Sequence, residues 1–196
     1  MAYTDAATVK ATLGIEGADD DALLTDLIAR AQGIIDSYCN RTFEAASDST
    51  RYFDAERCIS HDRRTLFLDA DLCQITTVIN GDGATISSDQ YVTIPRNETP
   101  WYEIRLKWGA DSYWTWDDDP EDAISVTGRW AYSVTAPVAI QHACIRLATW
   151  LYRQTDTGGG SEPGQSRLTA EGIVVVPSAL PEDVTSILNP FRRLAT

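Results

Sequence analysis

The stretch AISVTGRWAYSVTAPVAIQHACIRLATWLYRQ, residues 123–154, says most about the fold, because its hydrophobic period changes partway along. From Ile124 to Tyr132, apolar or small residues alternate with others, which predicts a half-buried strand. Pro137 then suits the first turn of a helix, where its missing N–H costs no hydrogen bond. The apolar residues that follow recur every three or four positions and predict a core helix over 137–154: Ile140, Ala143, Cys144, Leu147, Ala148 and Leu151.

A second amphipathic helix is predicted over residues 20–40, where one wide apolar stripe runs along the sequence. The acids at its start, Asp19, Asp20 and Asp21, suit the positive end of a helix dipole. We interpret them as a solvated helix start, with a metal site or a basic partner as alternatives. This helix is expected to pack against the one at 137–154. A short helix near 5–13 precedes it and ends before Gly14.

Between these helices, residues 42–133 read as short strands separated by turns. The runs are rich in Thr, Val, Ile and aromatic residues, and they are interrupted by turn signals such as the Asn-Gly-Asp-Gly run at 80–83. The predicted fold class is therefore α+β. We expect a small antiparallel helical bundle, with helices near 5–13, 20–40 and 137–154, that carries an inserted antiparallel β-sheet region and a C-terminal tethered strand plus short helix.

The C-terminal part is predicted to be a tethered arm. Residues 155–166, TDTGGGSEPGQS, have the composition of a flexible linker, which separates a core at 1–154 from an arm at 167–196. The arm contains a β-prone run and a short helix that begins at Pro181. It is expected to dock on its own domain or on a neighbouring chain. Its candidate contact residues are Ile173, Val174, Val175, Val176, Val184, Ile187, Leu188, Phe191, Arg192 and Arg193.

The charge balance argues against a surface that grips nucleic acid or anionic membrane. The chain has 29 acidic and 16 basic residues, a formal charge of -13, and its arginines are scattered. Nucleic-acid affinity depends largely on clustered Lys and Arg. The N-terminus does not have the pattern of a signal peptide, and no long apolar run predicts a membrane span. We therefore expect a soluble protein that is made in the cytosol and contacts no membrane.

No catalytic or cofactor motif stands out, so the sequence predicts no enzyme and no cofactor. The two histidines, His61 and His142, have no recognisable nucleophile beside them, and the Gly-Gly-Gly run at 158–160 lacks the lysine of a phosphate-binding loop. Cys58 and His61 have the spacing of half a zinc site without a second half nearby in sequence. The four cysteines are too irregularly spaced for a disulfide framework, and we interpret them as buried thiols.

The most conspicuous local feature is an aromatic run followed by acids, at residues 108–122. Its tryptophans are Trp108, Trp114 and Trp116, and its acids are Asp117, Asp118, Asp119, Glu121 and Asp122. A hairpin tip with partly buried tryptophans and solvated acids is the simplest interpretation. A contact with another subunit or partner is the second, and glycan or calcium binding is the third. Paired carboxylates for glycoside hydrolysis stay open as part of that last alternative.

The order of these elements resembles that of a known family. The segments that carry the resemblance are YTDAATVKATLGI (3–15), DDALLTDLIARAQGIIDSYCNRTF (20–43), the stretch at 123–154 and LPEDVTSILNPFRR (180–193). With the β-rich insert between them, they resemble the head-tail connector proteins of tailed bacteriophages, also called adaptor or head-completion proteins. The resemblance covers nearly the whole chain, no single motif is diagnostic, and the aromatic and acidic run inherits no role from it.

The resemblance implies a non-enzymatic virion protein of the neck. Such a protein forms a homo-oligomeric ring, a dodecamer in the virion, beneath the portal protein, and it offers a surface to the next neck or tail protein. It also implies that the C-terminal arm engages the portal. Double-stranded DNA passes through the ring without sequence-specific binding, and an acidic lumen suits this because it repels phosphate. The candidate channel-facing acids are those at 19–21 and 117–122.

Two alternatives to this interpretation remain. A tail-side completion or terminator protein would belong to the same machinery and would bind the tail tube in place of the portal. A carbohydrate-binding module or glycosidase would instead use the tryptophans and acids of residues 108–122.

Overall fold

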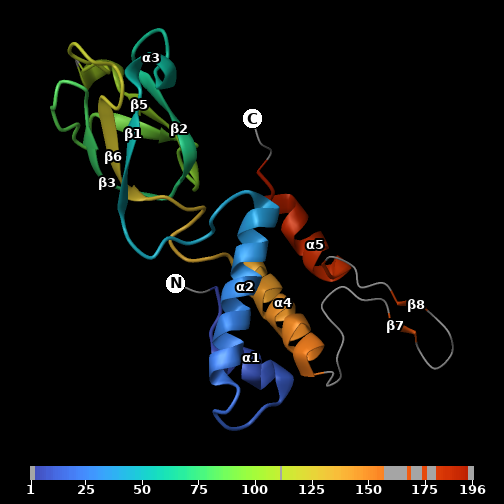
Figure 1. Cartoon of the computed structure of the whole chain (residues 1–196). Helices are drawn as coiled ribbons and strands as arrows, with labels where there is room; N and C mark the ends of the chain where they lie inside the picture. The colour runs from blue at the N-terminus through green and yellow to red at the C-terminus, as the bar shows by residue number, and fades with distance from the viewer. Residues whose placement is uncertain (1–2, 111, 157–166, 169–173, 176–179, 194–196) are drawn as a thin grey trace. The chain divides into compact units, whose positions relative to one another are not determined.

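The computed structural model describes residues 3–110, 112–156, 167–168, 174–175 and 180–193. The chain divides into two compact units, which we call the β unit, residues 41–137, and the helical unit, residues 2–40 with 138–196 (Figure 1). The β unit is thus an insertion between two helices that pack on each other, and the predicted α+β class is confirmed.

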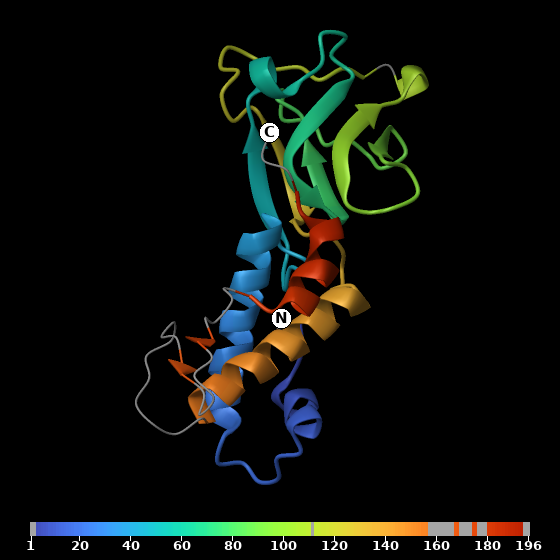
Figure 2. The same ribbon diagram turned by 90° about the vertical axis from the view of Figure 1, so that its right-hand side faces the viewer.

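The helical unit is built on two long antiparallel helices. They are α2 (Asp21–Cys39) and α4 (Val138–Asp156), which lie side by side in both ribbon views (Figure 1, Figure 2). Tyr152, near the end of α4, donates a 2.8 Å hydrogen bond to the carboxylate of Asp20, at the start of α2, which fixes the antiparallel direction. The predicted packing of these two helices is confirmed. Their apolar faces supply the fully buried Leu24, Ile35, Ile140 and Leu147.

Two shorter helices complete the helical unit. Helix α1 (Ala6–Leu13) begins after Asp5, whose carboxylate accepts a 2.7 Å hydrogen bond from the Thr8 amide, and ends at Gly14 with φ 71°. The stop at Gly14 is the one that the sequence predicts, and Asp5 is the residue that caps the start. Helix α5 (Glu182–Leu188) packs on α4 and α2 and continues into a short 3-10 turn, η2 (Asn189–Phe191).

The β unit contains two sheets of three antiparallel strands, in the orders β1-β6-β3 and β2-β5-β4. The strands are β1 (Ser49–Phe53), β2 (Thr65–Leu72), β3 (Gln74–Ile79), β4 (Tyr91–Ile94), β5 (Trp101–Leu106) and β6 (Ile124–Arg129). The unit also holds the single-turn helix α3 (Ala55–Cys58) and the 3-10 turn η1 (Trp108–Ala110).

The pairing of strands differs from the single small sheet that the sequence predicts. Both sheets contribute to one core, which contains Leu66, Leu72 and Ile104 from one sheet and Val78, Ile124 and Val126 from the other. Because there are two layers, the inward-facing side chains of each sheet pack against those of the other. In a single sheet the same side chains would be exposed to water. The alternation predicted for residues 124–132 is confirmed over 124–129, where Ile124, Val126 and Gly128 are buried and the residues between them are partly exposed. The strand ends at Arg129, and beyond it the alternation stops, since Trp130 and Ala131 are both buried.

Gly128 shows why β6 carries a glycine at its centre. A Cβ atom at this position would lie 2.0 Å from the carbonyl oxygen of Gln74 on β3. Only glycine allows the two strands to approach this closely.

A third sheet has only two strands, β7 (Arg167–Leu168) and β8 (Val174–Val175), which pair antiparallel. The strand expected over 173–176 is therefore present at Val174–Val175, while Ile173 and Val176 lie outside the described residues. The linker expected at 155–166 also falls almost entirely outside them.

Candidate interaction surfaces

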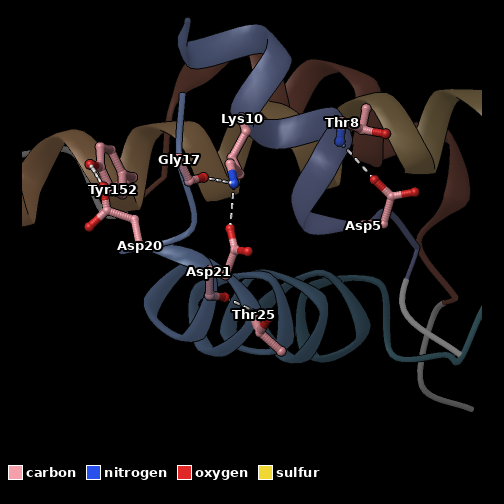
Figure 3. A network of polar contacts seen from close by, with 8 residues as sticks. All are labelled: Asp5, Thr8, Lys10, Gly17, Asp20, Asp21, Thr25 and Tyr152. Carbon is pink, nitrogen blue, oxygen red and sulfur yellow. Dashed lines mark hydrogen bonds and ion pairs between the residues drawn. The ribbon is translucent and has the colours of Figure 1, made fainter. Parts of the chain in front are cut away.

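The acidic start of α2 is held by hydrogen bonds from the chain's own helices (Figure 3). Lys10 on α1 bridges to the carboxylate of Asp21 at 2.6 Å and also donates to the carbonyl oxygen of Gly17. Asp20 accepts the hydrogen bond of Tyr152 from α4. Of the three candidate channel acids at the start of α2, Asp20 and Asp21 therefore join α1, α2 and α4 to one another, while Asp19 is exposed.

The second acidic run, residues 117–122, lies on a loop of the β unit, and its acids are exposed. The loop is tied to α3, because the Ala55 amide donates to the carbonyl of Pro120 at 2.8 Å and the Asp122 amide donates to Asp54 at 3.1 Å. Asp119 caps the turn by accepting from the Glu121 amide at 3.0 Å. Five carboxylates thus stand in solvent on an anchored loop.

The three candidate tryptophans lie in three different environments. Trp108 is 72% exposed, whereas Trp114 is fully buried and donates its ring N–H to the carbonyl of Arg64 at 3.1 Å. Trp116 is half-buried, and the guanidinium of Arg63 lies 4.6 Å from its ring centroid. Trp114 therefore departs from the expectation of a partner contact, because the core between the two sheets encloses it. The same burial removes it from a sugar-stacking platform.

Arg64 connects the exposed end of this aromatic run to the core. Its guanidinium lies 4.3 Å from the ring centroid of Trp108 and 4.5 Å from that of Tyr113, and it donates to the carbonyl of Lys107 at 2.8 Å. Arg64 itself is only 3% exposed. Trp108 and Tyr113 thus form an exposed aromatic pair over a fixed cation.

The C-terminal residues divide between the core and the surface. Val184 and Leu188 are fully buried in the helical unit, which departs from the expectation that they contact a partner, because α5 uses them to pack on its own chain. Ile187 and Phe191 are partly exposed, and Arg192 is exposed with its guanidinium 5.1 Å from the ring centroid of Tyr38.

Further polar contacts hold α5 in place. Arg146 on α4 donates to Asp183 at 2.8 Å, which lowers the pKa of that carboxyl below its usual value. Tyr38 donates to Asn189 at 2.7 Å, and the Arg193 amide donates to the carbonyl of Cys39 at 2.8 Å. The part of the expected arm that follows residue 180 is thus an element of the helical unit.

One feature of the β unit has no counterpart among the sequence-based expectations. Next to its junctions with the helices, residues 42–44 run beside residues 132–136, joined by hydrogen bonds from the Tyr132 amide to the carbonyl of Thr42 and from the Ala136 amide to Glu44. Arg41 at the same end pairs with the buried Asp71. No local pattern in the sequence predicts this ion pair, because Arg41 and Asp71 are thirty positions apart.

The family of the chain follows from its match to a family model. The model described as head completion protein matches residues 2–194. The chain belongs to the head completion protein family. The resemblance inferred from the sequence is therefore confirmed, and the protein is a component of a phage-type virion, where such proteins act structurally.

Solved structures with a similar fold come from gene transfer agent particles. A chain in the neck of an empty particle, computed with C6 symmetry, is 14% identical with a TM-score of 0.54, and the match covers 97% of this chain and 89% of that one. A chain in the virion of a native particle is 14% identical with a TM-score of 0.51, covering 92% and 81%. A comparison with curated proteins finds no match. At 14% identity, these two neighbours establish only the fold of this head completion protein.

Within the described part of this head completion protein, no three His, Cys, Asp or Glu side chains are placed to hold a metal ion. Cys39, Cys73 and Cys144 are buried thiols and Cys58 is partly buried. Burial raises the pKa of Cys144 to about 12, with a smaller contribution from the nearby Asp36, so this thiol stays protonated at neutral pH.

No helix in the described ranges is long and apolar enough to span a membrane.

Proposed function

We propose that this protein forms a ring in the neck of the virion, beneath the portal, which completes the DNA-filled head and receives the next neck or tail protein. The observation that carries the proposal is the family match over residues 2–194. The fold similarity to a chain from a C6-symmetric neck supports a ring of identical subunits. The C6 symmetry with which that neck was computed is compatible with a ring of six or twelve subunits, and we propose the dodecamer.

We further propose that the ring encloses an acidic channel for DNA. A net charge of -13 per subunit makes the assembly repel phosphate, so the duplex slides through without being held. The five exposed carboxylates on the loop at 117–122, together with Asp19, are the acids free to face the lumen. Asp20 and Asp21 are less suited to this role because their carboxylates bind Tyr152 and Lys10.

The surface that meets the portal is proposed to lie at the end of the helical unit formed by α5 and η2. Of the residues there, Ile187, Phe191 and Arg192 are at least partly exposed, and they combine an apolar anchor with a cation. This combination suits an interface centred on an aromatic and an arginine. The exposed pair of Trp108 and Tyr113 is proposed as a second contact, made with a neighbouring subunit or the next neck protein.

The test is electron microscopy of the purified protein alone and mixed with the portal protein and the tail tube protein of the same virus. A ring on the portal is expected. A protein that stays monomeric and binds neither partner contradicts the proposal, and a ring that binds only the tail tube assigns the chain to tail completion instead. Phe191→Ala is expected to weaken portal binding, while Tyr52→Ala, at an exposed site on β1, serves as the matched control.

A further inference from the structure

A groove in the β unit lies where the two sheets do not pair with each other. It has a volume of about 450 Å³ and lies between the first half of β3 and the outer strand β4. Both strands are sheet edges on this side, since among the described strands β3 pairs only with β6 and β4 only with β5. The lining residues are Cys73, Gln74, Ile75, Ser88, Tyr91, Val92, Thr93, Arg96, Asn97 and Trp101.

The hydrogen-bond pattern shows which backbone groups of β4 face the groove. The Lys107 amide donates to the carbonyl of Gln90 at 2.8 Å, so Gln90 and the alternate residues after it point toward β5. In an antiparallel pair the residues between them point the other way. The N–H and C=O groups of Tyr91 and Thr93 therefore face the open edge, where no partner strand is present among the described residues.

The free edge of β4 is short. Tyr91 and Thr93 together offer two N–H and two C=O groups, and equivalent groups of the two residues are about 7 Å apart, the repeat of an extended chain. Pro95 follows β4 directly and has no N–H to donate, so the edge available to an added strand ends with β4. The side chains that line the groove must therefore supply part of the affinity and selectivity.

The edge of β3 is covered over only part of its length. The Ile86 amide donates to the carbonyl of Val78 and the Asn80 amide donates to that of Ala84, so the loop at 84–86 protects the second half of β3. The first half, at residues 74–75, opens into the groove. Exposed strand edges of this type accept an added strand, with main-chain hydrogen bonds for affinity and side-chain pockets for selectivity.

The charge of the groove favours an acidic occupant. Arg96 is the only charged residue among the described residues that line it, and its side chain is exposed. None of the ion pairs between described residues involves Arg96, whereas Arg41, Arg51 and Arg129 of the same unit each pair with an aspartate. Arg96 therefore stands beside the open edge with its charge available to a carboxylate from outside.

The rest of the lining favours β-branched side chains next to that carboxylate. Ile75, Tyr91 and Trp101 line the groove and are each partly exposed, so they form an apolar wall that an added strand would cover. Val, Ile and Thr pack well on such a pleated surface. The groove thus fits an extended segment in which β-branched residues alternate with acids.

The described strands of this chain do not supply such a segment to a second copy. Among those at a sheet edge, β2 alone contains acidic residues, and it is already covered, because Leu66 bridges to Ile59 and Asp69 pairs with Arg51 of β1. The acidic loop at 117–122 is anchored by two hydrogen bonds at the start of α3. These contacts favour a different protein as the occupant.

We propose that this groove receives an extended acidic segment of the next neck or tail protein. The segment adds to β4 as a fourth strand of sheet β2-β5-β4 and places a carboxylate against Arg96. This inference rests on the proposed neck role and deepens it, because it names the chemistry by which the following component is held. The residues of α5 and η2 remain available for the portal.

Peptide binding to the full chain is the first test, followed by fluorescence anisotropy. One labelled probe is Ser-Thr-Val-Glu-Val-Glu-Val-Thr-Ser, and the other replaces both glutamates by lysines. The acidic probe is expected to bind about tenfold more tightly. Arg96→Glu should reverse this preference, whereas Arg30→Glu, the same charge change at an exposed site on α2, should leave it unchanged. Equal affinity for the two probes overturns the proposal.

Amide hydrogen exchange, measured residue by residue by NMR, shows whether the bound probe adds as a strand. The acidic probe is expected to slow exchange of the Tyr91 and Thr93 amides severalfold, because they gain hydrogen-bond partners. The Val92 amide points toward β5 and should change little. A bound acidic probe that leaves Tyr91 and Thr93 unprotected also overturns the proposal.

Cross-linking in the assembled neck identifies the source of the segment. Ser88→Cys, at an exposed site on the rim of the groove, is labelled with a photoactivatable maleimide, while the native cysteines are buried or partly buried. The expected product joins Ser88→Cys to an acidic segment of the next neck or tail protein. Thr50→Cys, exposed on β1, is the matched control and should not give this product. A product with a second copy of this chain, or none beyond that of the control, contradicts the proposal.

The outcomes separate this inference from the proposed function. Rings on the portal whose subunits show no preference for the acidic probe would leave the neck role standing and remove the groove contact. A chain that binds the acidic probe along β4 but never forms rings or binds the portal would remove the neck role.

Discussion

The Nε atom of Arg41 lies 3.4 Å from the Oδ2 atom of Asp71, and their side chains are only 10% and 4% exposed. Arg41 also stands 5.2 Å from the ring centroid of Tyr132. The three residues join the two ends of the β unit to β2. Because both charges are removed from water, each depends on the other to remain in the core.

Replacing Asp71 by Ala is therefore expected to destabilise the protein strongly. The change leaves the Arg41 guanidinium buried without its counter-ion, which costs about 3–5 kcal/mol of unfolding free energy. Urea denaturation measures the loss. Asp69→Ala is the matched control, since Asp69 is on the same strand and pairs with Arg51 in solvent, where such a pair contributes less than about 1 kcal/mol. Equal losses for the two variants would contradict the assignment.

Trp114 and Trp108 are expected to respond in opposite ways to truncation. Trp114→Ala removes a fully buried side chain from the core of the β unit and should cost about 3–5 kcal/mol. Trp108→Ala should leave the unfolding free energy within about 1 kcal/mol, because the ring is exposed. Thermal unfolding followed by near-UV circular dichroism checks both. A destabilised Trp108→Ala protein would show that its stacking on Arg64 is structural.

Helix α5 is expected to contribute to the stability of the helical unit. Leu188→Ala creates a cavity against α2 and α4 and should lower the unfolding free energy by about 2–5 kcal/mol. Ser186→Ala, at an exposed site on the same helix, is the control and should have little effect. If Leu188→Ala is as stable as this control, residues 180–193 are a detachable arm after all. Truncation after Gln154 would then leave a folded core.

Gly128→Ala is expected to disturb the pairing of β6 and β3. The added methyl group would meet the carbonyl of Gln74, so the strands must separate and lose hydrogen bonds. Gly33→Ala is the control, because a Cβ at Gly33 on α2 has open space and Ala favours a helix by about 1 kcal/mol over Gly. Urea midpoints should fall for Gly128→Ala and stay level or rise for Gly33→Ala.

Asp36 is expected to make stability fall as the pH rises above about 4. Burial raises its pKa above the usual value of 3.8, and the hydrogen bond from Tyr3 only partly offsets this. Between the unfolded and folded pKa values the native state binds more protons than the unfolded state, so raising the pH favours unfolding. Asp36→Asn should flatten this part of the stability profile. A profile unchanged by Asp36→Asn would show that other groups cause the slope.

Local sequence patterns are sufficient to predict the elements whose side chains repeat with a regular period. These elements are the strand at 124–129 and the helices that begin at Asp21 and Val138. Each buries one face, so apolar residues recur every two positions in the strand and every three or four positions in the helices. The end of α1 at Gly14 is also predictable, because a glycine in the left-handed conformation is a common helix stop. The order of elements along the whole chain was enough to identify the head completion family.

How distant segments meet is visible in the folded chain and in none of its local patterns. No local pattern predicts that the six strands of the β unit divide into two sheets. The same is true of the hydrogen bond from the buried Trp114 to the carbonyl of Arg64 and of the ion pair between Arg41 and Asp71. Strand pairing and core packing depend on long-range contacts, which the periodicity of one segment does not encode. The groove lined by Ile75, Tyr91 and Trp101, between β3 and β4, also depends on long-range contacts. It exists because β3 pairs with β6 and β4 pairs with β5, and the two strands do not pair with each other.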